Sequence, residues 1–330
     1  MSTTPVIDVH THILGSNWWE TIRSKGAPTY EVRPVASGRE CIFRDGSPVT
    51  IPTPGHFDLG LRIRDMDAAH VDMAVVSLTC PNVYWGGPQT SAEAARVSND
   101  ELASWQAAEP TRIRWFASLP WEYPDLAVAE LQRACAQGAV GVMVLANVAG
   151  RSLTDPSLAP IWAEIDARRL PVLVHPTDPP GIDRLDMGKY DLTWSVGFMF
   201  DTTLAIARMI LDGFLDRYPN LKIIASHGGA ALPMLVGRFD KGYEISTLED
   251  QVISAPPSEY LRRVFYDCIT YDENALRYLI SVVGESQVLF GSDYPHIVGD
   301  MAGMLRNVDA LDASASAAIR AGNAERIFGF

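Results

Sequence analysis

Cysteine and basic residues are both scarce in this sequence. Four cysteines are spread along 330 residues with no C-x-x-C pair, so neither a thiol redox motif nor a zinc ribbon is indicated. We expect all four to be reduced and most of them to be buried. The 27 Lys and Arg residues stand against 40 Asp and Glu residues, which gives a formal net charge of −13. This acidity argues against nucleic acid or an anionic membrane surface as a partner.

Long apolar runs and leader-like segments are also missing. The start, Met1 to Pro5, has neither the basic nor the apolar region of a signal peptide, and no apolar run approaches the length of a membrane span. We therefore expect a cytoplasmic protein without a membrane partner. Because 47% of the residues are hydrophobic, the chain can bury one large core, and we expect a single domain over residues 1–330.

Short apolar runs alternate with longer amphipathic segments, which is typical of repeated β-α units. The apolar runs predict eight strands, at Val6–His12, Met73–Leu78, Ile113–Leu119, Ala139–Leu145, Pro171–His175, Leu221–His227, Val264–Ile269 and Gln287–Asp293. Helical patterns lie between them, at about Leu59–Ala69, Ser91–Glu109, Asp125–Gln137, Leu158–Arg169, Thr202–Tyr218, Leu232–Ile245 and Asn274–Val283, with a last one near the C-terminus. The pattern predicts an α/β fold, a (β/α)8 TIM barrel.

The section from Gly15 to Gly55 interrupts this alternation. It contains Trp18, Trp19, Tyr30, several prolines and a predicted small hairpin around Phe43-Arg44-Asp45-Gly46-Ser47. Because it follows the first strand, an insertion over residues 15–55 would lie over the mouth of the barrel. We expect a lid that contributes walls to the active site, and the alternative is an insertion that only covers the surface.

Ligand-type side chains lie at the ends of four predicted strands. His10 and His12 are two residues apart, so both can point to one face of the first strand. His175, His227 and Asp293 end the fifth, sixth and eighth strands. A single histidine in such a place is more often a structural residue, but the five together predict a metal centre where barrel enzymes build their active sites.

The fourth strand bears on the number of metal ions. A two-metal site in a barrel of this kind often uses a bridging lysine on that strand, and Val140–Leu145 contains none. We therefore expect one divalent ion. The histidine and carboxylate donors suit zinc, and manganese is the alternative.

Four motifs together resemble the amidohydrolase superfamily. They are Ile7-Asp8-Val9-His10-Thr11-His12, Val174-His175-Pro176, Ser226-His227-Gly228-Gly229 and Gly291-Ser292-Asp293-Tyr294-Pro295. The chain resembles most the amidohydrolase family 2 branch that contains 2-amino-3-carboxymuconate-6-semialdehyde decarboxylase and related non-oxidative decarboxylases. Three further stretches add to the resemblance, Arg62–Asp67, Asn99–Ala103 and Ala321–Ala324, and it extends from about residue 6 to 328.

The resemblance implies a role for each of these residues. His10, His12, His175 and Asp293 would bind a zinc-type ion, with a water completing the site. His227 would be an acid/base residue rather than a fifth ligand. An open coordination position is what distinguishes a catalytic zinc from a structural one, which agrees with this assignment.

Arg238 matches a family arginine that binds the substrate carboxylate, in some members from the neighbouring subunit. A planar guanidinium suits a carboxylate because it can donate two parallel hydrogen bonds. The resemblance therefore implies a homodimer. The alternative is an ion pair of Arg238 on a helix surface.

The sequence also departs from the decarboxylase pattern. The place of a second arginine in that pattern falls, by spacing, near Thr50, where this sequence has no arginine, and His296 lies where the pattern has an apolar aromatic residue. The segment Ser195–Asp201 offers two Phe and a Met in place of small residues and a proline. We therefore expect a different acid as substrate. His296 is either a substrate-facing donor or a residue of the outer rim, and we interpret His56 and His70 as peripheral.

Aromatic side chains near the predicted mouth could build a pocket for a ring. Trp18, Trp85 and Phe198 are the candidates for substrate contact, with Trp19, Tyr84 and Phe200 beside them in the sequence. Core packing is the alternative for each of them.

These observations lead to a functional hypothesis, a metal-dependent carbon–carbon lyase in aromatic catabolism. It would remove CO2 without redox chemistry from a small aromatic, heteroaromatic or muconate-type acid, with His227 and Asp293 as proton donors and Arg238 on the carboxylate. Hydrolysis of an amide or lactone and hydration of a ring-cleavage product are alternatives, because the same ligands serve them. A non-catalytic barrel with a structural metal is a further one.

Overall fold

Eight parallel strands form one sheet in the computed structural model, which describes residues 4–36, 38–44, 47–179, 181–182, 184–246 and 251–330. In spatial order they are β1 (Ile7–Ile13), β5 (Met73–Leu78), β6 (Ile113–Ala117), β7 (Gly141–Leu145), β10 (Pro171–His175), β11 (Lys222–Ala225), β12 (Phe265–Asp267) and β13 (Val288–Leu289). Each predicted strand is present, and the last is much shorter than the predicted Gln287–Asp293.

Backbone hydrogen bonds between β1 and the chain after β13 close the sheet into a barrel. The Val9 amide donates to the Phe290 carbonyl at 3.0 Å, and the Asp293 amide donates to the His10 carbonyl at 2.8 Å. The His12 amide donates to the Tyr294 carbonyl at 2.7 Å. The prediction of a (β/α)8 barrel is confirmed, and the closure places Asp293 next to both histidines of β1.

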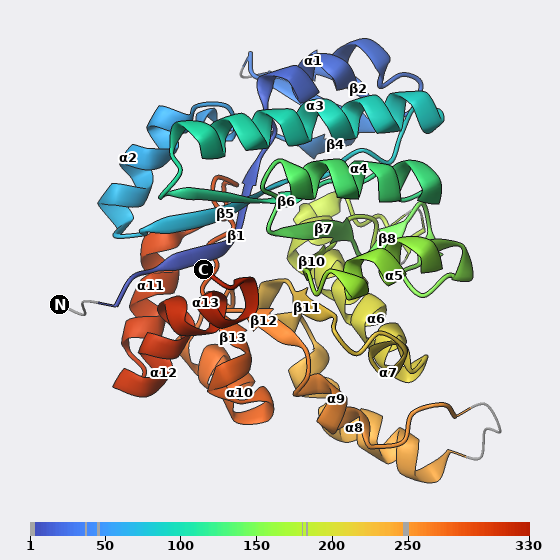
Figure 1. Ribbon diagram of the computed structural model, residues 1–330, viewed down its shortest axis with the longest axis vertical. Helices are drawn as coiled ribbons and strands as arrows, with labels where there is room; N and C mark the ends of the chain where they lie inside the picture. The colour runs from blue at the N-terminus through green and yellow to red at the C-terminus, as the bar shows by residue number, and fades with distance from the viewer. Residues whose placement is uncertain (1–3, 37, 45–46, 180, 183, 247–250) are drawn as a thin grey trace.

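Helices surround the sheet (Figure 1). The main ones are α2 (Leu59–Ala69), α3 (Gly87–Ala108), α4 (Pro124–Ala136), α5 (Ala159–Ala167), α6 (Phe198–Leu211), α8 (Leu232–Ile245), α10 (Glu273–Val283) and α11 (Met301–Asp309). Shorter ones are α7 (Phe214–Arg217), α9 (Pro257–Leu261), α12 (Ala313–Ala317) and α13 (Asn323–Phe328). The single helix predicted at Thr202–Tyr218 is wrong, because Gly213 adopts a left-handed conformation with φ 64° and separates α6 from α7.

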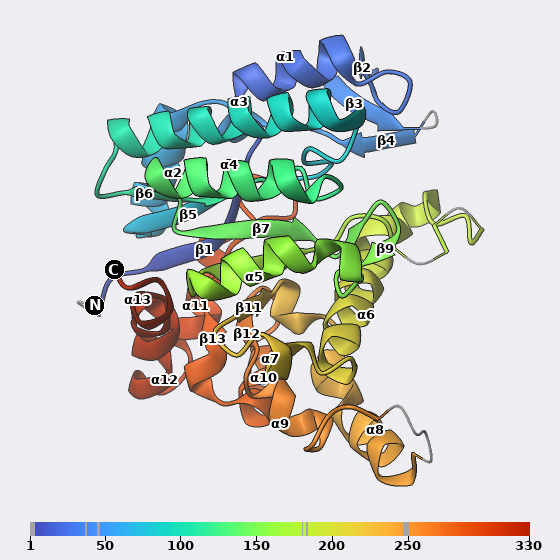
Figure 2. The ribbon, with the colours of Figure 1, turned by 45° about the vertical axis from the view of Figure 1, so that its right-hand side comes forward.

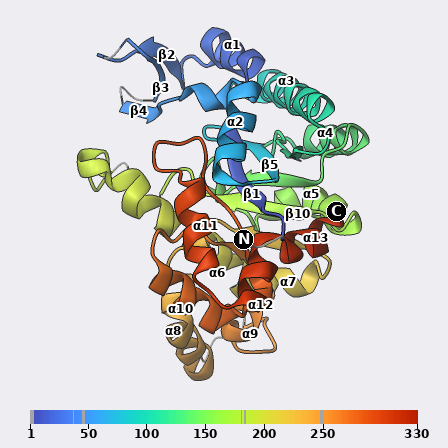
Figure 3. The same ribbon diagram turned by 90° about the vertical axis from the view of Figure 1, so that its left-hand side faces the viewer.

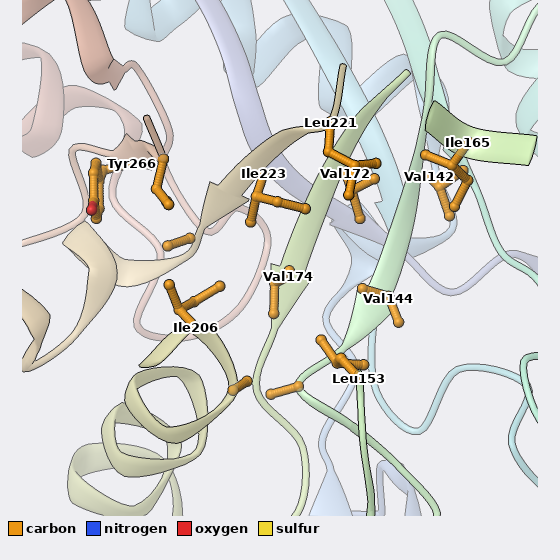
Figure 4. Packing of buried hydrophobic residues seen from close by; sticks show 14 of the residues in the cluster. Val142, Val144, Leu153, Ile165, Val172, Val174, Ile206, Leu221, Ile223 and Tyr266 are labelled. Carbon is orange, nitrogen blue, oxygen red and sulfur yellow. The ribbon is translucent and has the colours of Figure 1, made fainter. Parts of the chain in front are cut away.

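The strands alternate between two hydrophobic layers. Val142 and Val144 of β7, like Val172 and Val174 of β10, pack between the sheet and the surrounding helices (Figure 4). The intervening Leu173, with Met143 and Ile224 of the neighbouring strands, belongs to the cluster inside the barrel. Because side chains alternate along a strand, His175, two residues after Leu173, also lies on the inward face of β10.

An irregularity in β1 makes its ligand pair possible. Ile7 and Val9 belong to the inner cluster, so strict alternation would point His10 away from the barrel axis. The pairing of β1 with β5 shifts register between Asp8 and Thr11. Such a shift re-aims side chains next to active sites, and here it lets His10 and His12 both face inward.

The insertion after β1 forms α1 (Ser16–Lys25) and a three-stranded antiparallel sheet of β2 (Glu31–Pro34), β3 (Glu40–Arg44) and β4 (Ser47–Thr50). The predicted hairpin is confirmed in the pairing of β3 with β4, and Asp45 and Gly46 lie outside the described residues. Glu101 of α3 accepts hydrogen bonds from the backbone N–H of Ser16 and Asn17, which caps α1. Figure 3 shows the small sheet beside the barrel.

Two segments around the strand ends were not predicted. A short hairpin, β8 (Asn147–Val148) with β9 (Arg151–Ser152), follows β7, and a long irregular segment precedes α6. Figure 2 shows that this segment and the β2–β4 sheet lie at the same end of the molecule.

One apolar stretch corrects an expectation. The segment Lys189–Leu211 is 23 residues long and contains an 18-residue window of mean hydropathy 1.2, so by length and composition alone it could cross a membrane. Half of that window is buried within the fold, because α6 packs on the barrel. Length and composition alone are weak evidence for a span, and a barrel helix meets the same criteria.

Candidate metal centre

Five predicted residues converge at the carboxyl ends of the strands. His10, His175, His227 and Asp293 each offer a ligand atom, and these atoms lie within 4.8 Å of one another. The Nε2 atoms of His10 and His12 are 3.0 Å apart, and His12 Nε2 lies 3.2 Å from Asp293 Oδ1. The spacing predicted from strand ends is therefore realised in the fold.

The Nδ1 atoms of three histidines are held by partners behind the site. His10 Nδ1 lies 2.6 Å from Asp267 Oδ2, and His12 Nδ1 lies 3.0 Å from Ser77 Oγ. His175 Nδ1 lies 2.8 Å from the Pro176 carbonyl oxygen. Such partners fix the ring and its tautomer, and each leaves an Nε2 for an ion.

The Asp293 carboxylate supplies an open oxygen. Asp293 is 4% exposed, and its Oδ1 is buried without a hydrogen-bond partner among the described residues. A buried polar atom without a partner costs free energy, and a metal ion would remove that cost. The three Nε2 atoms and this oxygen therefore fit a divalent ion.

The protonation states of His12, His175 and Asp293 also suit metal binding. Burial lowers the pKa of His12 to about 3 and lowers that of His175 well below the ordinary imidazole value, so both imidazoles are neutral. Burial would raise the pKa of Asp293, but the neighbouring imidazoles of His12 and His227 outweigh burial and hold it well below the ordinary value. Neutral imidazoles and an ionised carboxylate are the forms that bind metals.

His227 differs from the three fixed histidines. Its Nε2 lies 3.7 Å from Asp293 Oδ2, and its Nδ1 is buried without a partner in the part of the chain that the structure describes. The backbone N–H of His227 donates a hydrogen bond to Asp267 Oδ2 at 2.8 Å. This bond supports the left-handed backbone conformation of His227, whose φ is 55°. Asp293 also has a left-handed backbone conformation, with φ 60°. Such conformations of non-glycine residues cluster at functional sites.

Two further histidines lie beside His12. The His296 and His12 ring centroids are 5.0 Å apart, and so are those of His56 and His296. His296 Nε2 lies 2.9 Å from Thr79 Oγ1. The interpretation of His56 as peripheral is wrong, because it is completely buried next to the site. His70, in contrast, lies exposed at the end of α2.

The substrate-contact candidates lie in different surroundings. Trp18 and Trp85 pack in a cluster with α1, and both indoles donate to the Asn82 carbonyl, so packing accounts for these two side chains. Phe198 has its ring centroid 6.4 Å from that of His175, at the metal centre. Arg238 is exposed on α8 and has no hydrogen-bond or ionic partner among the described residues.

A cavity of about 350 Å³ reaches Thr177, two residues beyond His175, and none of the proposed metal ligands is among the described residues that line it. Its walls come from the insertion and from loops after β5, β7 and β10, and include Tyr30, Arg44, Tyr84, Asn147, Thr177 and Asp178. This volume suits a small ligand. Arg44 is ion-paired with Asp178 at 2.8 Å, so the insertion brings a cation to the wall.

Sequence reasoning missed the residues that support the ligands. Asp267 ends β12, so the strand-end argument used for Asp293 could have found it. Arg62 is fully buried on α2 and donates to Thr11 Oγ1 at 2.7 Å and to the His12 carbonyl. The resemblance included the stretch Arg62–Asp67, but no local pattern predicted that Arg62 would be buried against β1.

The fold and this donor set define a metal-dependent barrel enzyme. A family model described as Amidohydrolase matches residues 7–330, and the chain belongs to the amidohydrolase family.

Named relatives add to this assignment. The chain is 33% identical over 304 residues to 2-amino-3-carboxymuconate-6-semialdehyde decarboxylase of Dictyostelium discoideum, covering 89% of this chain and 83% of that protein. It is 32% identical to gamma-resorcylate decarboxylase of Polaromonas sp., over 71% of this chain and 76% of that one. The solved 5-carboxyvanillate decarboxylase of Sphingomonas paucimobilis superposes with a TM-score of 0.87 at 27% identity, covering 99% and 100%. The predicted carboxy-lyase class agrees with all three.

Proposed function

We propose that this protein is a metal-dependent non-oxidative decarboxylase of a small aromatic, heteroaromatic or muconate-type carboxylic acid. The observation that carries the proposal is a donor set, His10, His175 and Asp293 with His12 at 3.0 Å from His10 and 3.2 Å from Asp293, beside His227, whose Nδ1 has no partner among the described residues. The resemblance to three named decarboxylases supports this chemistry over others of the same fold.

His10, His12, His175 and Asp293 would hold one divalent ion, zinc in our proposal and manganese as the alternative. When bound, the ion supplies Lewis-acid polarisation of substrate oxygens. Their depth in the barrel keeps these side chains away from bulk water, which strengthens every electrostatic contact with a bound acid.

His227 is the proposed proton donor, with Asp293 beside it. Transfer of a proton to the ring carbon that carries the carboxylate breaks conjugation. Heterolysis of the carbon–carbon bond then releases CO2, and its electron pair returns to the ring and restores conjugation. The proton stays on the product carbon, so no oxidant or reductant is consumed. General acid catalysis of this kind contributes about 10²–10⁴-fold.

Substrate binding is assigned to Arg238, His296 and Phe198. Phe198 and His296 lie at the metal centre, next to His175 and His12 respectively. Arg238 is exposed and unpaired among the described residues, so it is free to bind a carboxylate in a neighbouring subunit. The residue 15–55 insertion would act as a lid, which its share of the cavity wall supports.

A homodimer would explain the exposed apolar side chains of α6 and α8. Phe200 and Leu204 are 55% and 58% exposed, and Met234 on the helix that carries Arg238 is 71% exposed. The Ala231 N–H donates to Thr203 Oγ1 and joins the two helices. Apolar groups gathered in this way favour a protein interface.

Turnover of a panel of acids with and without added metal tests the proposal. We expect CO2 release in step with substrate loss, abolished by a chelator and restored by zinc. The same panel should include lactones, amides and ring-cleavage products, since a hydrolase or hydratase would consume substrate without CO2. Consumption of these compounds alone would replace the proposal with one of those activities.

A further inference from the structure

His56, His296 and His12 form a row of imidazoles that ends at the metal centre. Ring centroids are 5.0 Å apart at each step, with interplanar angles of 65° and 55°. Neither His56 nor His296 belongs to the ligand set proposed above, so their place in the row requires another explanation.

The tautomer of His56 follows from its hydrogen bonds. The backbone N–H of Thr53 donates to His56 Nδ1 at 3.0 Å, and a nitrogen that accepts a hydrogen bond carries no proton. The proton of this neutral imidazole is therefore on Nε2. That Nε2 is buried without an acceptor in the described residues, and the ring lies in edge contact with His296. This contact between the two rings restricts the rotation of the His296 imidazole.

His296 has one nitrogen engaged and one available. Its Nε2 lies 2.9 Å from Thr79 Oγ1, and its Nδ1 has no partner among the residues described. A ligand atom of His296 lies within 4.8 Å of those of His12 and Asp293. A group bound at the metal centre would therefore lie beside this side chain.

We infer that His296 is a specificity-determining residue that binds a second oxygen substituent of the acid, a hydroxyl or a carboxylate, and that His56 is the positioning residue behind it. The inference rests on the proposed function, because it places the acid at the metal. A neutral imidazole with a free nitrogen offers a hydrogen bond to such a group. An acid without that group would leave the half-buried nitrogen unpaired, which disfavours its binding.

Binding of 2-hydroxybenzoate and 2,6-dihydroxybenzoate to the zinc-loaded protein tests the inference by calorimetry, with CO2 release measured in parallel. We expect about tenfold tighter binding of the dihydroxy acid to the natural chain. His296→Phe should reduce this preference to within twofold while zinc content stays the same, and His296→Gln should retain part of it. His56→Leu should weaken the preference only when His296 is present.

Each contrary outcome is distinct. An unchanged preference in His296→Phe, or no measurable binding of either acid to the natural chain, would overturn the inference. Loss of zinc in His296→Phe would overturn it as well, because His296 would then be a metal ligand. A preference that depends on His296 without any release of CO2 would uphold the subsite and contradict the proposed decarboxylase.

Discussion

The Asp267 carboxylate lies 2.6 Å from His10 Nδ1, and both side chains are completely buried. The same carboxylate accepts hydrogen bonds from the backbone N–H of His227 and Gly228, each at 2.8 Å. One residue at the end of β12 therefore orients the proposed metal ligand His10 of β1 and the loop that carries the proposed acid. A carboxylate behind a metal-bound imidazole also increases the basicity of that ligand.

Asp267→Asn should weaken metal binding. The amide offers one acceptor oxygen in place of two, so His10 and the His227 loop lose part of their support. We expect about 10–100-fold lower metal affinity, measured by competition with a chromophoric chelator. Asp212→Asn, a carboxylate at the end of α6 outside the metal centre, is the control and should leave affinity within twofold. Equal affinity of Asp267→Asn and the natural chain would contradict the role of this carboxylate.

His227→Asn should separate catalysis from metal binding. The variant keeps a polar side chain but removes the group that transfers the proton. We expect a loss of about 10²–10⁴-fold in kcat with one metal ion still bound per chain, measured by steady-state kinetics and elemental analysis. Turnover at the natural rate with metal bound would remove His227 from the mechanism.

Arg238→Ala should raise KM for the acid, and Arg238→Lys should not restore it, since a lysine cannot donate the two parallel hydrogen bonds. Mixing Arg238→Ala with His227→Asn tests whether the arginine acts across a dimer. If it does, mixed dimers contain one intact site, and activity should return above that of either variant alone. Full activity of Arg238→Ala would leave this side chain without a role in binding.

Asp201 should make stability depend on pH. Burial raises its pKa to about 6, although Thr177 and Asn147 donate hydrogen bonds to it. The folded chain thus keeps a proton that the unfolded chain releases near pH 4, so stability from this group falls as pH rises from about 4 to 6, by about 3 kcal/mol. In Asp201→Asn, the free energy of unfolding measured with urea should lose this part of its decrease between pH 4 and 6.

A control for the pH effect is available on the surface. Asp186 is exposed and adopts a left-handed conformation that asparagine tolerates. Asp186→Asn should therefore unfold with the same pH dependence as the natural chain. A slope that is identical in all three proteins would show that Asp201 does not titrate in this range.

Periodicity was enough to predict the barrel because each strand carries its own apolar signal, and Leu173 and Val174 illustrate how both faces are buried. The convergence of the proposed metal donors was predictable for a related reason. Parallel strands bring their carboxyl ends together, so His10, His175 and Asp293 could be placed in one site without knowledge of the packing.

Residues positioned by tertiary contacts were not predictable in this way. His56 lies in a Pro-Gly segment that is typical of a surface loop, yet the chain folds it against Thr53 and His296. Trp18 and Trp85 have the composition of a ring pocket, but they fill the space between the insertion and the barrel. Which surface such a side chain meets depends on the docking of the insertion, and no local pattern encodes that.

Turnover in D2O with ¹³C-carboxyl-labelled acid tests the central claim most directly. The account predicts one labelled CO2 for each molecule of acid consumed, and one deuterium on the product carbon that carried the carboxylate. Retention of the label in the product, with a solvent oxygen incorporated instead, would contradict decarboxylation and assign the metal centre to hydrolysis or hydration.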